Sequence, residues 1–243
     1  MVTRLFAKQL CAGPIPAFDI REQCSGFVYG LQMADAFIKT GQYRNILLIG
    51  GEVHSRALDK STRGRTITVL FGDGAGAAVI GRGDQDHGIL CSRMHSDGAD
   101  AEALWMPYPG MSRGRDGILT HEELDQALQY PTMEGQKVFK TAVRRMPEVI
   151  RETLDEVGLT VEDIDLLIPH QANLRINEMV AKLLKIDPAK VHNNIQRLGN
   201  TTAATIPLCL LEARELGKVK AGDLVCAVAF GSGFTWGSVL MRW

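Results

Sequence analysis

Residues 44–52, RNILLIGGE, form a near-continuous apolar run that ends in glycine and a carboxylate, a pattern that predicts a β-strand covered on both faces. Four further runs have the same character: TITVLFG (66–72), AAVIG (77–81), IDLLIPH (164–170) and LVCAVAFG (224–231). Longer amphipathic stretches lie between them, and in residues 138–157 the apolar side chains recur at helical spacing. The alternation of these two patterns predicts an α/β protein.

A polar stretch rich in glycine and proline, residues 107–132, interrupts this alternation. It contains one short helical pattern, HEELDQALQ, with Thr120 as a plausible N-cap. Loops of this length inside a compact domain are often lids or binding loops, and a plain surface insertion is the equally weighted alternative. We therefore expect three segments: residues 1–106, the excursion 107–132 and residues 133–243.

The segments on either side of the excursion share a spacing that indicates an internal repeat. Cys24 is followed by a helical stretch to Gly41 and then by the strand ILLIG. Asn200 is followed, at the same spacing, by a helical stretch to Gly217 and then by the strand LVCAV. A duplication would place Cys24 and Asn200 at equivalent positions, each before a helix, facing one another across a pseudo-twofold axis.

Each half also contains a glycine-rich turn before another apolar run, FGDG at 71–74 and FGSG at 230–233. Residues 72–77 formally satisfy a dinucleotide-binding glycine pattern, but a short apolar run follows instead of a helix. The nucleotide interpretation is therefore rejected. A tight turn between strands at 66–71 and 77–81 explains the glycines better.

The composition is that of an ordinary globular protein, with 243 residues of which 45% are hydrophobic and 23% charged. The net charge of -1 supplies no general attraction to nucleic acid or to an anionic membrane. No apolar run approaches the roughly 20 residues of a membrane helix and no signal-peptide pattern is present, so we expect a cytoplasmic protein. The five cysteines are widely spaced and never form a CxxC pair, which predicts neither a disulfide framework nor a metal site.

Three side chains are candidates for chemistry. Cys24 precedes a predicted helix, whose free N–H groups and dipole favour a thiolate; an inert buried cysteine is the alternative. His170 follows Pro169 at the carboxyl end of a predicted strand, where α/β sheets bind ligands, although a structural hydrogen bond is the commoner role of a lone histidine. Asn200 alone would be interpreted as a helix N-cap. The three together favour a catalytic site more strongly than each does alone.

Five motifs resemble β-ketoacyl-acyl-carrier-protein synthase III, a condensing enzyme of the thiolase superfamily. They are FDI through CSGF (18–27), LFGDGAGAA (70–78), PHQANLRI (169–176), GNTTAA (199–204) and FGSGFTWG (230–237). The resemblance covers nearly the whole chain, least securely at 107–132. It implies a thiolase-like five-layered αβαβα sandwich of two similar halves, with the first half incomplete because the family's opening strand and helix units are missing before Met1. The chain is then expected to be a fragment of a longer protein, with a truncated product as the alternative.

The resemblance also implies catalytic roles. Cys24 would be the nucleophile that accepts an acyl group from acyl-CoA, which splits a difficult condensation into two easier steps. Backbone N–H groups of Cys24 and Ser232 would bind the oxyanion, with Ser232 at a position where the family usually has glycine. His170, through Nε2–H, and Asn200, through its amide, would stabilise the enolate left when malonyl-acyl-carrier protein loses carbon dioxide. The products would be 3-oxoacyl-acyl-carrier protein, CoA and carbon dioxide, at the initiation of fatty acid synthesis.

Binding residues are implied in the same way. CoA and the carrier arm would contact Arg65, Phe139, Asn173 and Arg175, with Arg63 as a competitor for the role of Arg65. An acidic carrier protein would dock on Lys140, Arg175 and Lys182, with Lys137 and Arg144 on the same basic face, unless these are ordinary solvated helix positions. No permanently bound cofactor is implied, only CoA thioester and phosphopantetheine-carrier substrates, and a homodimer is expected.

Two other functions remain open from the sequence. The same three residues would serve a related condensing enzyme of a secondary-metabolite or long-chain pathway. The missing N-terminal units also allow an inactive, truncated acyl-binding remnant.

Overall fold

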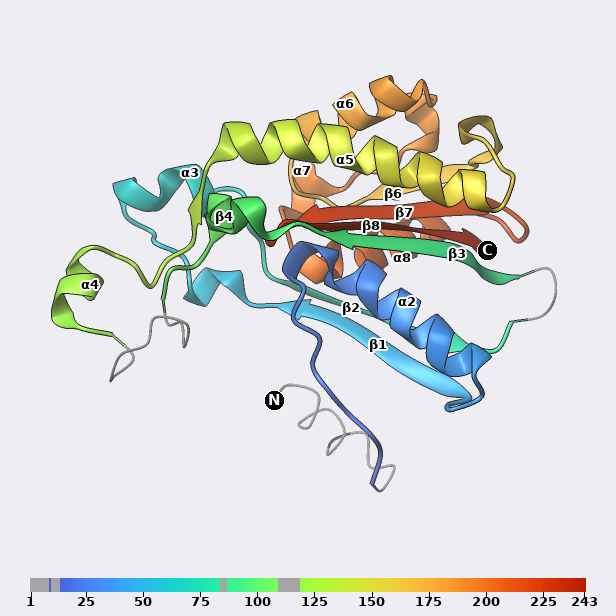
Figure 1. Ribbon diagram of the computed structural model, residues 1–243, viewed down its shortest axis with the longest axis horizontal. Coiled ribbons are helices and arrows are strands. Elements are labelled where there is room, and N and C mark those ends of the chain that lie inside the picture. The colour runs from blue at the N-terminus through green and yellow to red at the C-terminus, as the bar shows by residue number, and fades with distance from the viewer. Residues whose placement is uncertain (1–8, 10–13, 84–86, 109–118) are drawn as a thin grey trace.

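The computed structural model of the chain describes residue 9 and residues 14–83, 87–108 and 119–243 (Figure 1). Within these residues, β1 (Asn45–Glu52) pairs antiparallel with β2 (Gly74–Gly81), and four strands form a mixed sheet in the order β3-β8-β7-β6. The bounds of the remaining strands are β3 Gly88–Ser96, β4 Leu104–Trp105, β5 Thr132–Met133, β6 Leu166–Pro169, β7 Leu224–Gly231 and β8 Thr235–Arg242.

The helices connect and cover these strands. The α-helices are α2 Gly26–Lys39, α3 Arg65–Thr68, α4 His121–Asp125, α5 Gly135–Glu156, α6 Leu174–Leu184, α7 Ile195–Leu198 and α8 Thr205–Glu215. The short 3-10 turns are η1 Gln23–Ser25, η2 His54–Arg56, η3 Thr62–Gly64, η4 Gly98–Ala103, η6 Val161–Asp163, η7 Pro188–Lys190 and η8 Thr202–Ala204. None of the helices in the described ranges is long and apolar enough to cross a bilayer.

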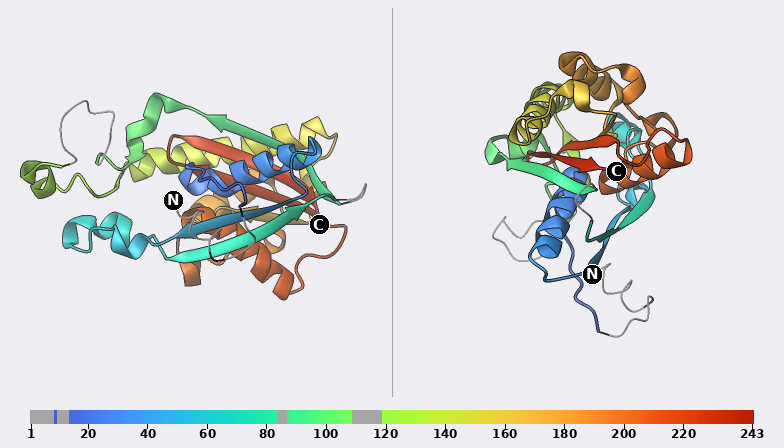
Figure 2. Two further views of the ribbon diagram at one scale, coloured as in Figure 1. Left: turned by 90° about the horizontal axis from the view of Figure 1, so that it is seen from below. Right: turned by 90° about the vertical axis from the view of Figure 1, so that its right-hand side faces the viewer.

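The elements stack in layers, which Figures 1 and 2 show from three sides. Helices α5 and α6 cover one face of the four-stranded sheet, where Met146, Ile150 and Val180 pack on Leu167 and Leu240. Helices α2 and α8 cover its other face, and β1 and β2 lie beyond them. The α/β class predicted from the sequence is confirmed, and α2 and α8 form an inner helix layer between two sheets.

The strands differ in how they are covered. β6 and β7 are buried along their whole length, as their continuous apolar sequences predict. β1 and β2 have exposed outer faces: Leu47 and Val79, opposite each other in the register, are 45% and 72% exposed. No helix of the described residues covers this outer face. The prediction of two covered faces is therefore wrong for β1 and β2 in this structure.

The predicted strand at 66–72 is also wrong. Residues Arg65–Thr68 form helix α3, and Phe71 makes only an isolated parallel bridge to Asn200. A short apolar run such as TITVLFG is compatible with either a strand or a buried helix segment. The conformation of this segment is decided by backbone pairing of Leu70–Gly72 with Asn200, which is far away in the sequence.

The two glycine-rich turns have different structures. The predicted turn between 66–71 and 77–81 does not form, because β2 begins at Gly74 and pairs with β1. Residues Gly74–Gly81 form a strand and not a helix, which agrees with the rejection of a nucleotide-binding loop. The second turn, 230–233, does connect two antiparallel strands, with Gly231 of β7 opposite Thr235 of β8.

The internal repeat is present, but with a different equivalence from the predicted one. A single shift in numbering aligns the starts of α2 and α8 and the bounds of β1 and β7. The same shift aligns Gln23 with Thr202, whose φ angles of 46° and 50° lie in the left-handed region that non-glycine residues rarely adopt. It therefore aligns Cys24 with Ala203, and the predicted equivalence of Cys24 with Asn200 is wrong.

The chain passes from the two-stranded sheet of β1 and β2 to the four-stranded sheet at β3. β3 pairs with β8 along its length, from Gly88 opposite Arg242 to Ser96 opposite Thr235. A strand from within the predicted N-terminal segment, residues 1–106, thus belongs to the sheet of the C-terminal half. Within the excursion, residues 109–118 lie outside the described residues, and Thr120 caps α4 as predicted.

Candidate active site

Cys24 lies in the turn η1, directly before α2, and is 7% exposed. The turn packs against the end of β7: a Cβ atom added to Gly231 would lie 2.8 Å from Cys24 Cβ and 3.3 Å from the backbone nitrogen of Ser25. Only glycine permits this approach. Ser25 anchors the turn, since its Oγ donates to the carbonyl of Thr235 at 3.0 Å. The thiol is therefore held at a helix N-terminus by buried contacts.

The surroundings of the Cys24 thiol act on its ionisation in opposite directions. The pKa of Cys24 is raised to about 12: burial raises it most and the negative charge of Glu52 also raises it, whereas a hydrogen bond with the Asn200 side chain lowers it. Burial thus opposes the stabilisation that a helix N-terminus gives to a thiolate. In the substrate-free protein at neutral pH the thiol is protonated, and a reaction at sulfur needs an acceptor for its proton.

His170 follows β6 and is 2% exposed. Its N–H donates to the carbonyl of Val228 at 2.7 Å, which extends the parallel pairing of β6 with β7. Its ring Nδ1 lies 2.7 Å from Thr205 Oγ1, and Thr205 Oγ1 donates to the carbonyl of Thr202 at 2.9 Å. Because this hydroxyl proton is already committed, Thr205 accepts from His170, which places the ring proton on Nδ1.

The remaining ring nitrogen of His170, Nε2, is buried and has no hydrogen-bond partner within the described residues. Burial lowers the pKa of His170 to about 3, so the ring is neutral at ordinary pH and Nε2 presents a lone pair. The prediction that Nε2–H donates to an enolate requires the other tautomer. That tautomer forms if the Thr205 hydroxyl rotates and donates to Nδ1.

Asn200 comes directly after Gly199 and is 5% exposed. Its backbone pairs with the segment before β2: its N–H donates to the Leu70 carbonyl at 2.8 Å, and its carbonyl accepts from Gly72 N–H at 3.0 Å. Its side-chain Oδ1 accepts from Thr202 N–H at 2.8 Å, so Nδ2 remains to hydrogen-bond the Cys24 thiol. The structure thus brings Asn200 and Cys24 into direct contact.

The three candidate residues meet around η8. Cys24 contacts Asn200 directly, and His170 is linked to the same loop through Thr205 and Thr202. They come from η1, from the end of β6 and from the loop before η8, which are far apart in the sequence. Such a cluster of a thiol, a neutral imidazole and a carboxamide is suited to nucleophilic attack on a carbonyl and to stabilisation of negative oxygen.

Gln171, which no sequence pattern marked as a candidate, is fully buried beside His170. Its Nε2 donates to the Pro169 carbonyl at 2.7 Å, and its Oε1 accepts from the N–H groups of Asn194 and Ile195 at 3.0 and 3.1 Å. It therefore ties the end of β6 to the start of α7, the helix that leads to Asn200. A polar side chain next to a candidate catalytic histidine at the end of a buried strand was the signal that could have identified it.

Glu52 was also missed, although its charge acts on the nucleophile. It lies at the end of β1, half-buried, and its carboxylate accepts from Ala203 N–H, while burial raises its pKa. The change Glu52→Gln keeps an acceptor for Ala203 and removes the charge that disfavours the Cys24 thiolate. We expect the rate of Cys24 alkylation by iodoacetamide at pH 9 to rise about 3- to 10-fold.

Peptide mass spectrometry measures this rate at Cys24 alone. Glu122→Gln on the exposed helix α4 is the control and should leave the rate unchanged. Equal rates for Glu52→Gln and the unmodified chain would mean that the Glu52 charge does not act on the thiol.

The predicted binding residues are spread over several elements. Ser232 follows Gly231, and its Oγ donates to the Leu104 carbonyl at 2.6 Å. Arg65 is exposed at the start of α3, while the competitor Arg63 is paired with Asp59 at 2.7 Å. Phe139 packs against the core between α5 and the large sheet.

Asn173 caps α6, where its Oδ1 accepts from Arg175 N–H at 3.0 Å. It also lines an open pocket of about 250 Å³ together with Leu70 and Gly199, next to Asn200. Arg65, Phe139 and Arg175 are not among the residues that line this pocket. The structure therefore brings one of the four predicted substrate-binding residues close to the cluster.

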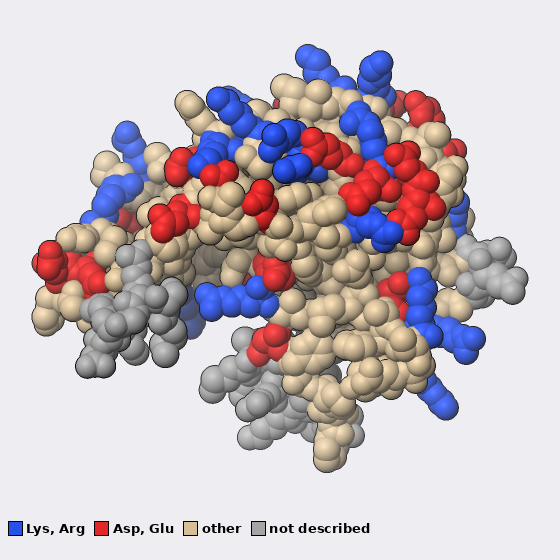
Figure 3. All heavy atoms as spheres, viewed as in Figure 1, with Lys and Arg blue, Asp and Glu red and all other residues tan. Residues whose placement is uncertain are grey.

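The predicted docking residues lie on the outer helix layer. Lys140 is exposed on α5, and Arg175 and Lys182 are exposed on α6. Figure 3 shows many basic side chains over these helices, interspersed with acidic ones. Lys137, also on α5, is paired with Asp100 at 2.5 Å. In the described ranges of the chain, no group of three or more His, Cys, Asp or Glu side chains is arranged to hold a metal ion.

The sequence and the fold match those of known proteins. Two family models match, 3-Oxoacyl-[acyl-carrier-protein (ACP)] synthase III at residues 18–98 and the C-terminal model of the same enzyme at residues 154–243. The β-ketoacyl-[acyl-carrier-protein] synthase III of Caldanaerobacter subterraneus is 47% identical over 227 residues, which are 93% of this chain and 67% of that protein. The enzyme of the same name from Aquifex aeolicus is 45% identical over 239 residues, covering 98% of this chain and 71% of that protein.

Solved structures are similar as well. The crystal structure of 3-oxoacyl-[acyl-carrier-protein] synthase III from Aquifex aeolicus has a TM-score of 0.88 and 44% identity, covering 99% of this chain and 71% of that chain. The priming β-ketosynthase of the R1128 polyketide biosynthetic pathway has a TM-score of 0.85 and 30% identity, covering 98% of this chain and 69% of that chain. The chain thus spans about two thirds of the length of these similar proteins.

Proposed function

Because the chain belongs to the 3-oxoacyl-[acyl-carrier-protein] synthase III family of thiolase-like condensing enzymes, we propose that it condenses an acyl-CoA with malonyl-acyl-carrier protein at the start of fatty acid synthesis. The enzymes of this family are transferases. The single observation that carries the assignment of residues is the packing of η1, the turn of Cys24, against η8, whose Thr202 binds the Asn200 side chain and, through Thr205, His170.

In the first step, Cys24 sulfur attacks the carbonyl carbon of the acyl-CoA thioester. Since the thiol is protonated in the free protein, the lone pair of His170 Nε2 is the acceptor for its proton. The backbone N–H groups of Cys24 and Ser232 stabilise the oxyanion. The carbon–sulfur bond to CoA then breaks, and the leaving CoA sulfur takes the proton from His170. The products of this step are acyl-Cys24 and CoA.

In the second step, malonyl-acyl-carrier protein occupies the site left by CoA. Its carbon–carboxylate bond breaks, carbon dioxide leaves, and the electron pair forms an enolate on the thioester oxygen. Asn200 Nδ2 donates to this oxygen, and His170 donates from Nε2 in the tautomer that the Thr205 hydroxyl permits. The enolate carbon attacks the acyl-Cys24 carbonyl, and the Cys24 thiolate leaves and takes up a proton from solvent. The product is 3-oxoacyl-acyl-carrier protein.

Substrate contacts, partners and location belong to the same proposal. The arm of CoA and of the carrier contacts Arg65, Phe139, Asn173 and Arg175. The carrier protein docks on Lys140, Arg175 and Lys182, where charges of opposite sign speed association. The enzyme acts in the cytoplasm as a homodimer, without a bound cofactor.

The test is a direct one on the purified chain. Incubation with a panel of acyl-CoAs of about two to sixteen carbons should add one acyl mass to the Cys24 peptide, and malonyl-carrier protein should then release that mass as 3-oxoacyl-carrier protein. The acyl chain preferred in the panel distinguishes fatty acid initiation from a related pathway, which the similarity to a polyketide priming ketosynthase favours as second candidate. A chain that forms no adduct with any acyl-CoA would instead be an inactive acyl-binding protein.

A further inference from the structure

Two side chains from the end of β1 reach across to the loop that carries Asn200. His54, the first residue of η2, hydrogen-bonds Thr202 Oγ1 through Nε2, and its side chain is 20% exposed. The Glu52 carboxylate accepts from the N–H of Ala203, the next residue of that loop. The loop of the C-terminal half is therefore held by side chains of the N-terminal half.

His54 also contacts Phe71, in the segment that pairs with the Asn200 backbone. Its ring lies 4.6 Å from the ring of Phe71, measured between centroids. Phe71 is bridged to Asn200, and the neighbouring Gly72 N–H donates to the Asn200 carbonyl at 3.0 Å. The His54 imidazole thus contacts Phe71, whose segment pairs with Asn200, and also Thr202, which follows Asn200 in the chain.

Thr202 is the junction between the two polar catalytic side chains. It has a φ of 50°, an unfavourable conformation for a β-branched residue, which surrounding contacts must hold in place. In this conformation its N–H donates to Asn200 Oδ1 at 2.8 Å, and its carbonyl accepts from Thr205 Oγ1, which binds His170. The N–H of Thr202 therefore decides which end of the Asn200 amide faces Cys24.

We propose that His54 is a positioning residue for condensation: by holding Thr202 it keeps Asn200 Nδ2 directed at Cys24 and at the substrate oxygen. This inference rests on the proposed function of Asn200. If Thr202 moves, the Asn200 amide loses the donor that fixes it and can rotate, which presents Oδ1 to the thiol and to the developing enolate. Condensation then loses the Asn200 Nδ2 donor. Acylation is less affected, because the Cys24 sulfur, the turn that holds it and the proton acceptor His170 are all still present.

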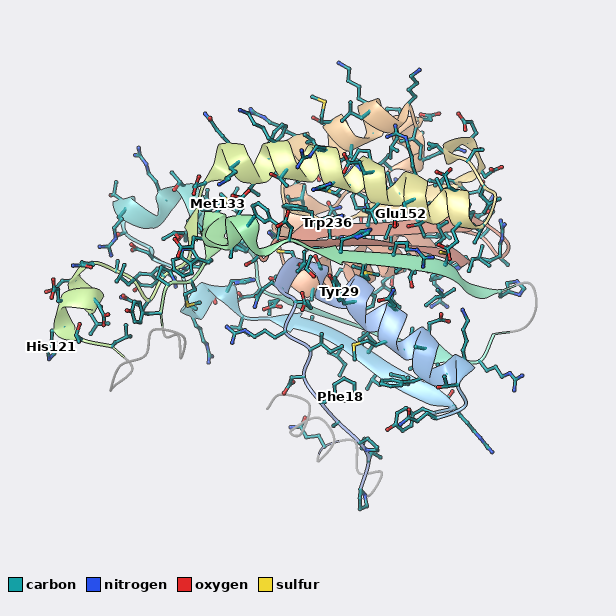
Figure 4. All side chains as sticks on the ribbon, in the orientation of Figure 1. Phe18, Tyr29, His121, Met133, Glu152 and Trp236 are labelled. Carbon is teal, nitrogen blue, oxygen red and sulfur yellow. The ribbon has the colours of Figure 1, made fainter. Side chains whose placement is uncertain are left out.

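The experiment compares His54→Ala with His54→Gln, in which the amide nitrogen can take the place of Nε2 toward Thr202. His121→Ala is the matched control, because His121 is exposed on α4, which Figure 4 shows well apart from Tyr29 of α2, the helix that follows Cys24. The first readout is the rate of Cys24 alkylation at pH 9 in the substrate-free chain. Asn200 lowers the pKa of Cys24, so His54→Ala should raise that pKa and slow alkylation about 3- to 10-fold. His54→Gln should recover to within about 2-fold, and His121→Ala should not differ from the unmodified chain.

The second readout separates the two half-reactions. For His54→Ala we expect acylation of Cys24 to fall less than about 10-fold and condensation to fall about 10-fold further, with recovery in His54→Gln. Unchanged alkylation and unchanged condensation in His54→Ala would overturn the inference. So would an equal loss in His54→Ala and His54→Gln accompanied by a lower melting temperature, since that pattern indicates a structural role. If the unmodified chain neither acylates nor condenses, the proposed function fails, while the alkylation rates still decide whether His54 positions Asn200.

Discussion

Cys24→Ala is expected to lower acyl transfer from acyl-CoA by at least about 10⁴-fold, because the sulfur that forms the covalent intermediate is gone. The fold should persist, since the side chain is small and the turn is anchored by Ser25 and Gly231 rather than by the thiol. Intact-mass spectrometry after incubation with acyl-CoA measures the adduct, and release of free CoA measures the rate. No adduct should form at any acyl length.

Cys91 provides a matched control. It is a free cysteine with almost the same exposure, 8% against 7% for Cys24, but it lies on β3. Cys91→Ala should leave both acylation and condensation within about 2-fold of the unmodified chain. If Cys24→Ala still acquired an acyl group on a single site, the nucleophile would have to be another residue and the proposed function would need a different centre.

Asn200→Ala is expected to divide the two half-reactions. Condensation should fall about 10²- to 10³-fold, the range seen when one preorganised donor to an oxyanion is removed. Acylation should fall only a few-fold, because the lost hydrogen bond raises the pKa of Cys24 and so reduces its thiolate fraction at a given pH. Parallel assays of CoA release and of 3-oxoacyl-carrier product give the two rates.

Asn200→Asp is the informative companion to this variant. It keeps the oxygen that accepts from Thr202 N–H and so retains the loop, but it replaces the Nδ2 donor with a carboxylate oxygen. Condensation should be lost as in Asn200→Ala, and Cys24 alkylation should slow further because of the added negative charge. An equal loss of both half-reactions in Asn200→Ala would contradict the division of labour between Cys24 and Asn200.

The elements of the fold that could be predicted from the sequence are those whose burial shows in the apolar pattern of their own residues. β6 and β7 lie between two helix layers, so every position is apolar and the strands were evident. Helix α5 covers one face of a sheet, and its periodic apolar residues identified it. The segment 66–72 was misassigned because its conformation depends on pairing with Asn200, a contact that no local pattern encodes.

The sequence marked the three candidate side chains, but it did not predict how they are arranged. Cys24, His170 and Asn200 stand next to helix and strand ends, and motifs around them marked them out. The expected equivalence of Cys24 and Asn200 failed because the repeat aligns the helix starts, which places Ala203 opposite Cys24. Glu52 and His54 went unnoticed for a related reason: each acts on a residue of the other half, through contacts that exist only in the folded chain.

The central place of α2 has a consequence for how the protein is made. Its apolar residues Phe27, Val28 and Leu31 are synthesised well before the elements that they pack against, Ile206 of α8 and strands β7 and β8. During translation this helix therefore exposes an aggregation-prone apolar surface until α8, β7 and β8 have left the ribosome. Domains dominated by such distant pairings gain their native contacts late, within roughly milliseconds to seconds after release, and chaperones are expected to bind the exposed surface in the meantime.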